Sequence, residues 1–89
     1  GEETYYQVNA EAAEEVARQL RLRNLSGIII VDFINMAEKE NRQKLLEYLK
    51  TLTAGDPMHP RIVDMTPLGL VEITRKKSHP TLAEQWKKI

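Results

Sequence analysis

Apolar residues recur every three or four positions in two stretches of the chain. In the first stretch, which follows Asn9, the apolar positions are Ala12, Ala13, Val16, Ala17 and Leu20. In the second, from about Ala37 to Leu52, they include Leu45, Leu46, Leu49 and Leu52. This spacing places the apolar side chains on one face of a helix. The pattern therefore predicts two amphipathic helices, and Asn9 is a suitable N-cap for the first.

Two shorter stretches are predicted to be strands. Residues Ile28–Asp32 are rich in β-branched side chains without polar alternation, which is typical of a strand buried on both faces. Arg61–Met65 has a similar but weaker pattern. Because a helix connects the two, we expect them to pair in parallel through a right-handed crossover.

The segment that begins at Thr66 has two interpretations. Thr66 as N-cap and Pro67 at the first helical position favour a third helix. Alternatively, Leu70–Thr74 is a strand that returns after a Pro-Leu-Gly turn. We favour the helix, and Leu82–Lys88 is predicted to form a last short helix. The expected fold is a small α/β domain of order α-β-α-β-α with a partial parallel sheet.

Composition narrows the class of protein. The chain has only 89 residues, so we expect one small domain over residues 1–89. Its formal net charge is zero. The chain has no cysteine, which excludes disulfides and thiolate metal sites and favours a reducing cytoplasm. No apolar run is long enough to span a membrane. The charged start without an initiator Met indicates a fragment of a longer protein.

Asp32 is the main candidate for chemistry. It follows the apolar run Ile28–Val31, and ligands often collect at the C-terminal ends of strands in α/β sheets. The functional interpretation is a Mg²⁺ ligand, because this ion prefers carboxylate oxygens and water. The structural interpretation is a cap for the following turn. Asp64 would face the same crevice if the two strands were parallel neighbours, although a solvated or turn-capping role is favoured for it.

Basic residues supply candidate phosphate contacts. Arg21, with Arg18 and Arg23, ends the first predicted helix, and Lys76 lies in a second basic cluster with Lys77. Each cluster has the alternative of a solvated helix end. Phe33 is placed where a nucleic-acid base could stack, although core packing is the commoner role of such a residue. His59 and His79 have no ligand partners at a suitable spacing and are expected at the surface rather than on zinc.

Three segments together resemble the ribonuclease E/G family. They are residues 9–27, residues 28–36 and residues 66–76. The resemblance implies a Mg²⁺-dependent endonuclease that cuts single-stranded RNA, with the ion held by two aspartates of a deoxyribonuclease-I-like subdomain. Asp32 stands at the second aspartate, whereas the first lies upstream of this segment. The resemblance also implies a basic residue near His59 or Arg61 that reads the RNA 5′ end. Asp64 does not match a family aspartate.

Two functional hypotheses follow, beside a third in which the chain is a folded fragment that neither cleaves nor binds RNA. In the first, the chain is part of the catalytic domain of an endoribonuclease involved in RNA processing and decay. The isolated fragment would be inactive, and the parent would be a cytoplasmic homo-oligomer. In the second, the chain is a non-catalytic RNA-binding or assembly module. Its RNA binding would depend on salt and on basic residues such as Arg21 and Lys76, but not on Asp32 or Mg²⁺.

Overall fold

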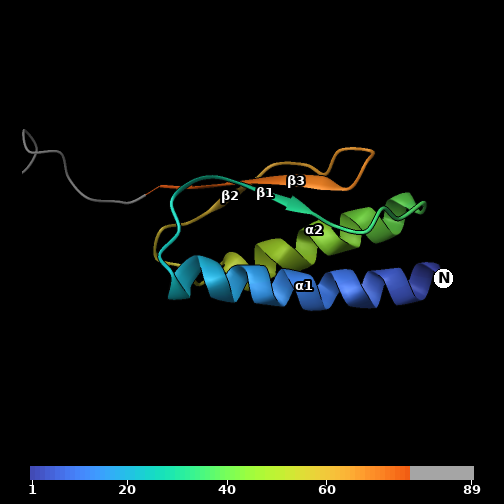
Figure 1. The fold of residues 1–89 in the computed structure, drawn as a ribbon, viewed down its shortest axis with the longest axis horizontal. Coiled ribbons are helices and arrows are strands. Elements are labelled where there is room, and N and C mark those ends of the chain that lie inside the picture. The colour runs from blue at the N-terminus through green and yellow to red at the C-terminus, as the bar shows by residue number, and fades with distance from the viewer. Residues whose placement is uncertain (77–89) are drawn as a thin grey trace, which may run out of the picture.

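The computed structural model describes residues 1–76, in which two helices cover one side of a three-stranded sheet (Figure 1). The elements in chain order are α1 (Glu2–Leu22), β1 (Gly27–Asp32), α2 (Lys39–Thr53), β2 (Arg61–Ile62) and β3 (Leu70–Arg75). The helix predicted over Leu82–Lys88 lies outside the described residues. Both amphipathic helices and the first strand are confirmed.

Helix α1 begins well before Asn9, so the prediction of an N-cap at that position is wrong. Asn9 lies inside the helix with 1% of its surface exposed. Its side-chain amide donates a hydrogen bond to the Ile34 carbonyl and accepts one from the Ile34 N–H. Glu2 and Glu3 occupy the first turn instead, where negative charge stabilises the N-terminal end of a helix.

The sheet is antiparallel, so the predicted parallel sheet is wrong. Its strand order is β1-β3-β2, and β3 pairs antiparallel with both neighbours. Strands β1 and β2 therefore run in the same direction, but β3 separates them. The helix-linked crossover was inferred from adjacent elements along the chain, and nothing in that pattern revealed that a later strand would enter between them.

Strand β3 replaces the third helix that we favoured. From Leu70 to Arg75 the buried and more exposed positions alternate, which is the period of a strand and not of a helix. Pro67 lies in a turn that the Gly69 N–H closes by donating to the Thr66 carbonyl over 3.0 Å. The N-cap and proline signals therefore belong to a tight turn, where the same residue types are also favoured.

Strand β1 is covered on one face only, which corrects the expectation of burial on both. Ile29 and Val31 pack against the core, whereas Ile28 is 68% exposed and Ile30 is 56% exposed. Both helices lie on the same side of the sheet (Figure 1), and so the opposite face is open among the described residues. The core between the layers is built from Ala13, Leu20, Phe33, Met36, Leu45, Leu46, Leu49, Val71 and Ile73.

Gly69 is required where the turn before β3 approaches the end of β1. Its φ is +90°, and a Cβ there would lie 2.7 Å from the Phe33 carbonyl oxygen. We expect Gly69→Ala to lower the free energy of unfolding by about 1–3 kcal/mol, because it combines backbone strain with a clash. Urea denaturation would measure this loss. Gly55→Ala is the matched control, since its Cβ would meet no atom within 4 Å; equal stability of the two variants would contradict the prediction.

Candidate functional site

Asp32 ends β1 on the open face of the sheet. Alternation along the strand places it on the same face as Ile28 and Ile30, and it is exposed. Within residues 1–76 its carboxylate takes part in none of the side-chain hydrogen bonds, so the turn-cap interpretation has no support there. The carboxylate is thus free for a ligand that approaches this face.

The backbone next to Asp32 is held firmly in place. The Phe33 N–H donates to the Gly69 carbonyl over 3.1 Å. The Asn9 amide donates to the Ile34 carbonyl and accepts from the Ile34 N–H, each over 2.8 Å. Because Asn9 is buried in α1, the helix fixes the path of the chain directly after Asp32. The backbone after Asp32 is therefore held by both α1 and the turn before β3.

The rest of the loop into α2 is fixed by two charged side chains. The Glu2 carboxylate accepts the N–H groups of Ala37 and Glu38 over 3.2 and 2.9 Å. The Arg42 guanidinium donates to the carbonyls of Met36 and Ala37 over 2.7 and 2.9 Å. Glu2 therefore caps the N-terminus of α2 from a distant part of the sequence. The Arg42 guanidinium is held in hydrogen bonds to the same loop.

The antiparallel register brings Glu72 to the same face. Ile30 lies opposite Glu72 and Asp32 lies opposite Leu70, so Asp32 and Glu72 are diagonal neighbours. Such pairs have Cα atoms about 7–8 Å apart. Glu72 was missed because only the register of β3 against β1 reveals it. Two carboxylates suit Mg²⁺, which commonly takes one or two and completes its shell with waters and phosphate oxygens. Residues 1–76 contain no group of three His, Cys, Asp or Glu placed to hold a metal.

Asp64 does not join this site, so the possible pairing of Asp32 with Asp64 is not realised. Asp64 follows β2, and β3 lies between β2 and β1. It lines a separate hollow with Lys39, Arg42 and Met65. Phe33 is 4% exposed and belongs to the core, which confirms its structural interpretation.

A groove rich in basic residues lies at the other end of β1. Its volume is about 600 Å³, and we refer to it as the basic groove. It brings together three of the predicted RNA-binding residues, namely His59, Arg61 and Lys76. The remainder of its lining consists of Gly27, Ile28, Met58 and Thr74.

The basic groove and Asp32 share one sheet face. Ile28 lines the groove, and Asp32 follows it on the same face after two further alternations. At about 3.4 Å per residue, Gly27 and Asp32 are roughly 17 Å apart along β1. A ligand that extends along this face could therefore contact both ends.

The predicted contact Arg21 lies elsewhere. It lines a shallow hollow on α1 with Arg18 and Leu22 and does not contribute to the basic groove. Arg18 is engaged by Glu15 through hydrogen bonds of 2.8 and 3.0 Å. The C-terminal part of α1 therefore exposes Arg18 and Arg21 outside the basic groove.

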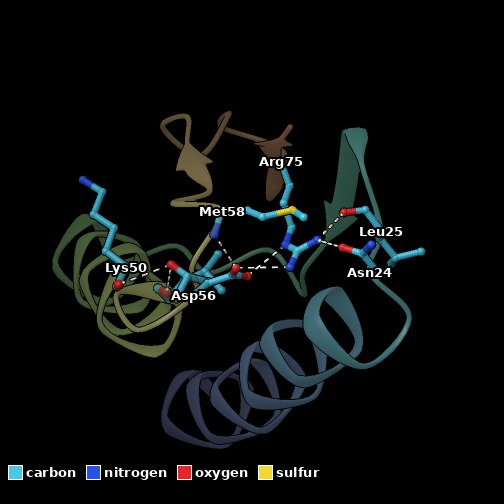
Figure 2. Close-up of polar contacts among 8 residues, drawn as sticks. Asn24, Leu25, Lys50, Asp56, Met58 and Arg75 are labelled. Atoms are coloured by element: carbon cyan, nitrogen blue, oxygen red, sulfur yellow. Dashed lines mark hydrogen bonds and ion pairs between the residues drawn. The ribbon is translucent and has the colours of Figure 1, made fainter. Parts of the chain in front are cut away.

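A buried ion pair joins the end of β3 to the loop after α2 (Figure 2). The Arg75 guanidinium donates to both carboxylate oxygens of Asp56, over 2.9 and 3.1 Å. Its remaining terminal nitrogen donates to the Asn24 side chain and to the Leu25 carbonyl, each over 2.9 Å. Hydrogen bonding to Arg75 lowers the pKa of Asp56, and the Met58 N–H lowers it further, whereas burial acts in the opposite direction. The pattern of charges along the sequence did not reveal this pair.

Comparison with known proteins identifies the class to which this fold and site belong. Residues 1–78 match the Ribonuclease E/G family. The chain is 45% identical over 82 residues to Ribonuclease E of Nostoc sp. and 43% identical over 81 residues to Ribonuclease G of Salmonella typhimurium. These alignments cover 92% and 91% of the chain. The chain belongs to the ribonuclease E/G family, which confirms the resemblance seen in the sequence.

The chain spans only a small part of these relatives. The alignments cover 12% of the Nostoc protein and 17% of the Salmonella protein. No helix in the described part of the chain is both long and apolar enough to cross a membrane.

Proposed function

We propose that this chain is part of the catalytic domain of an endoribonuclease that cleaves single-stranded RNA in RNA processing and decay. The observation that carries the proposal is the shared sheet face, which has a free carboxylate at one end of β1 and the basic groove at the other. Membership of the ribonuclease E/G family supports RNA as the substrate. The parent protein would act in the cytoplasm as a homo-oligomer.

In this proposal Asp32 is a ligand of Mg²⁺, and Glu72 is the neighbouring carboxylate. The bound ion would activate water for attack on a phosphodiester and offset the negative charge that develops. The protein side of the site is the Asp32 carboxylate, and the backbone that follows it is held by the hydrogen bonds of Asn9 and Gly69. The isolated chain would be inactive, because a further aspartate is expected upstream of this segment.

A titration with Mn²⁺ tests the metal site without measuring activity. Mn²⁺ is paramagnetic and broadens nearby NMR signals, so weak binding by the 89-residue chain is detectable. We expect broadening around Asp32, Phe33 and Glu72 that is absent in Asp32→Asn. Broadening centred on another acidic cluster would contradict the assignment of the metal to Asp32.

The basic groove is proposed to contact the RNA backbone. We expect Arg61→Glu and Lys76→Glu each to weaken binding of a fluorescent single-stranded oligouridylate. Each should also reduce the slope of log K against log salt by about 0.7, the value for one phosphate contact on a single strand. Fluorescence anisotropy over a series of salt concentrations would measure both quantities.

Lys50→Glu is the charge-matched control for the two groove variants. Lys50 is on α2, outside the basic groove, and pairs only weakly with Glu47 at 3.7 Å. Equal losses in this control and in the groove variants would indicate a general effect of net charge and would contradict a specific contact. Arg21→Glu should resemble the control, because Arg21 lies outside the groove.

The second candidate function is RNA binding without catalysis. The groove favours it, because His59, Arg61 and Lys76 come together independently of Asp32. Under this hypothesis Asp32→Asn leaves RNA binding by the 89-residue chain unchanged and also leaves the activity of the parent intact. Cleavage by the parent variant therefore distinguishes the two functions.

A further inference from the structure

We propose that the buried Arg75–Asp56 pair is a positioning device for the basic groove, which fixes where His59, Arg61 and Lys76 meet a bound RNA. The inference rests on the proposed function of the groove in RNA binding. Neither residue lines the groove. Both would act through the segments they connect.

The groove is assembled from three segments that are distant in sequence. Gly27 and Ile28 follow the connection from α1 to β1, Met58 to Arg61 come from the loop after α2 and from β2, and Thr74 and Lys76 flank the end of β3. The guanidinium of Arg75 belongs to the third segment and bonds to the other two. A single side chain thus joins all three walls (Figure 2).

Asp56 holds the backbone of the second segment in place through hydrogen bonds to Met58 and His59. One carboxylate oxygen accepts the Met58 N–H over 2.9 Å, and the Asp56 carbonyl accepts the His59 N–H over 3.0 Å. His59 has a φ of +49°, a conformation that costs energy in a residue other than glycine. The anchored turn compensates for this cost and places His59 at the groove.

The Arg75 end sets the first and third segments. Arg75 lies opposite Gly27 in the sheet register, and its side chain also bonds to the Leu25 carbonyl and the Asn24 side chain. Asn24, with a φ of +49°, ends α1 in the left-handed conformation that asparagine readily adopts, and the Leu25 N–H donates to the Leu20 carbonyl over 3.0 Å. Because Arg75 points inward, its neighbour Lys76 is presented at the groove.

The chemistry of the pair fits positioning better than stability. Arg75 is 3% exposed and Asp56 is 1% exposed, and burying two charges consumes much of the Coulombic gain. Well-packed apolar residues often give equal stability at such a site. They would not reproduce four directional hydrogen bonds from one planar group to two separate loops, which is the property that arginine supplies.

The test separates positioning from stability with the variant Asp56→Asn/Arg75→Met in the 89-residue chain. This variant removes both charges, so no unpaired charge remains buried, and Asn can still accept the Met58 N–H. Urea denaturation measures stability, and NMR hydrogen exchange measures the amides of Met58 and His59. Anisotropy with a fluorescent single-stranded oligouridylate measures RNA affinity. Leu45→Ala, a core change in α2, is the control for a general loss of stability.

We expect the double variant to unfold cooperatively and to bind RNA roughly tenfold more weakly, a change of about 1.4 kcal/mol. Its Met58 and His59 amides should exchange at least several times faster, relative to global unfolding, than in the wild type. Leu45→Ala should retain both properties when compared at equal folded fraction. Wild-type affinity and protected amides in the double variant would overturn the inference. If the wild type fails to bind RNA, the groove's proposed function fails, while amide exchange still decides whether the pair positions these loops.

Discussion

Asp32→Asn in the full-length protein is expected to reduce cleavage of single-stranded RNA by at least about a hundredfold, because the charge that holds the metal is removed and several kcal/mol of transition-state stabilisation is lost with it. The fold should be unaffected. The side chain is exposed, forms no hydrogen bond within residues 1–76, and is replaced by one of nearly equal shape. Single-turnover cleavage under saturating enzyme would measure the chemical step, and thermal unfolding would confirm the fold.

Two matched carboxylate variants make this result specific. Asp64→Asn should cleave at the wild-type rate, because Asp64 lies beyond β3 in a different hollow. Glu72→Gln should cause a smaller loss than Asp32→Asn if it assists the ion from its diagonal position on β3. Normal cleavage by Asp32→Asn would reject the metal assignment and favour the non-catalytic RNA-binding module.

The helices and the first strand could be predicted because the spacing and type of their apolar residues were sufficient to identify them. The leucines of α2 recur with the period of a helix, and all of Leu45, Leu46 and Leu49 are buried as expected. The run at Ile28 was correctly read as a strand from its β-branched residues. The predicted burial of both its faces was wrong, because an uninterrupted apolar run does not show whether anything covers the second face of the strand.

The errors arose where one residue type serves two structures. Thr66 and Pro67 are favoured both at helix starts and in turns, and the choice between them depended on β3 finding a partner in β1. Asparagine is a favoured N-cap residue, yet the Asn9 side chain is hydrogen-bonded to the backbone of Ile34, which is 25 residues away. Long-range contacts of this kind leave no local pattern in a single sequence.

The candidate site was predictable in part for the same reason. Asp32 follows its strand directly, so local sequence was sufficient to select it. Lys76 was selected from a basic cluster, and His59 and Arg61 were selected through the family resemblance. Their convergence in one groove follows from the sheet register. Arg75 directly precedes the basic cluster of Lys76 and Lys77, but alternation along β3 directs its side chain inward to Asp56.

The second large effect is expected at this ion pair. Arg75→Met should lower the free energy of unfolding by about 3–5 kcal/mol at neutral pH, because it leaves the Asp56 carboxylate buried without its partner. Urea denaturation of the 89-residue chain would measure the change. A loss below about 1 kcal/mol would show that Asp56 finds another partner or water. Asp56→Asn/Arg75→Met should be more stable than Arg75→Met, since it removes the orphaned charge as well.

The pH dependence gives an independent check on the same pair. In the wild type the pKa of Asp56 lies below its ordinary value of 3.8, mainly because Arg75 bonds to the carboxylate. The unfolded chain therefore binds a proton at Asp56 before the folded chain does as the pH falls. The stability contributed by this group is fully present above the unfolded pKa and is lost as acid lowers the pH below about 3.8, towards the folded pKa. In Arg75→Met the lowering is removed and burial raises the pKa, so acidification should shrink the difference in stability between this variant and the wild type. A difference that stays constant from about pH 7 to pH 3 would show that the Asp56 charge does not cause the loss.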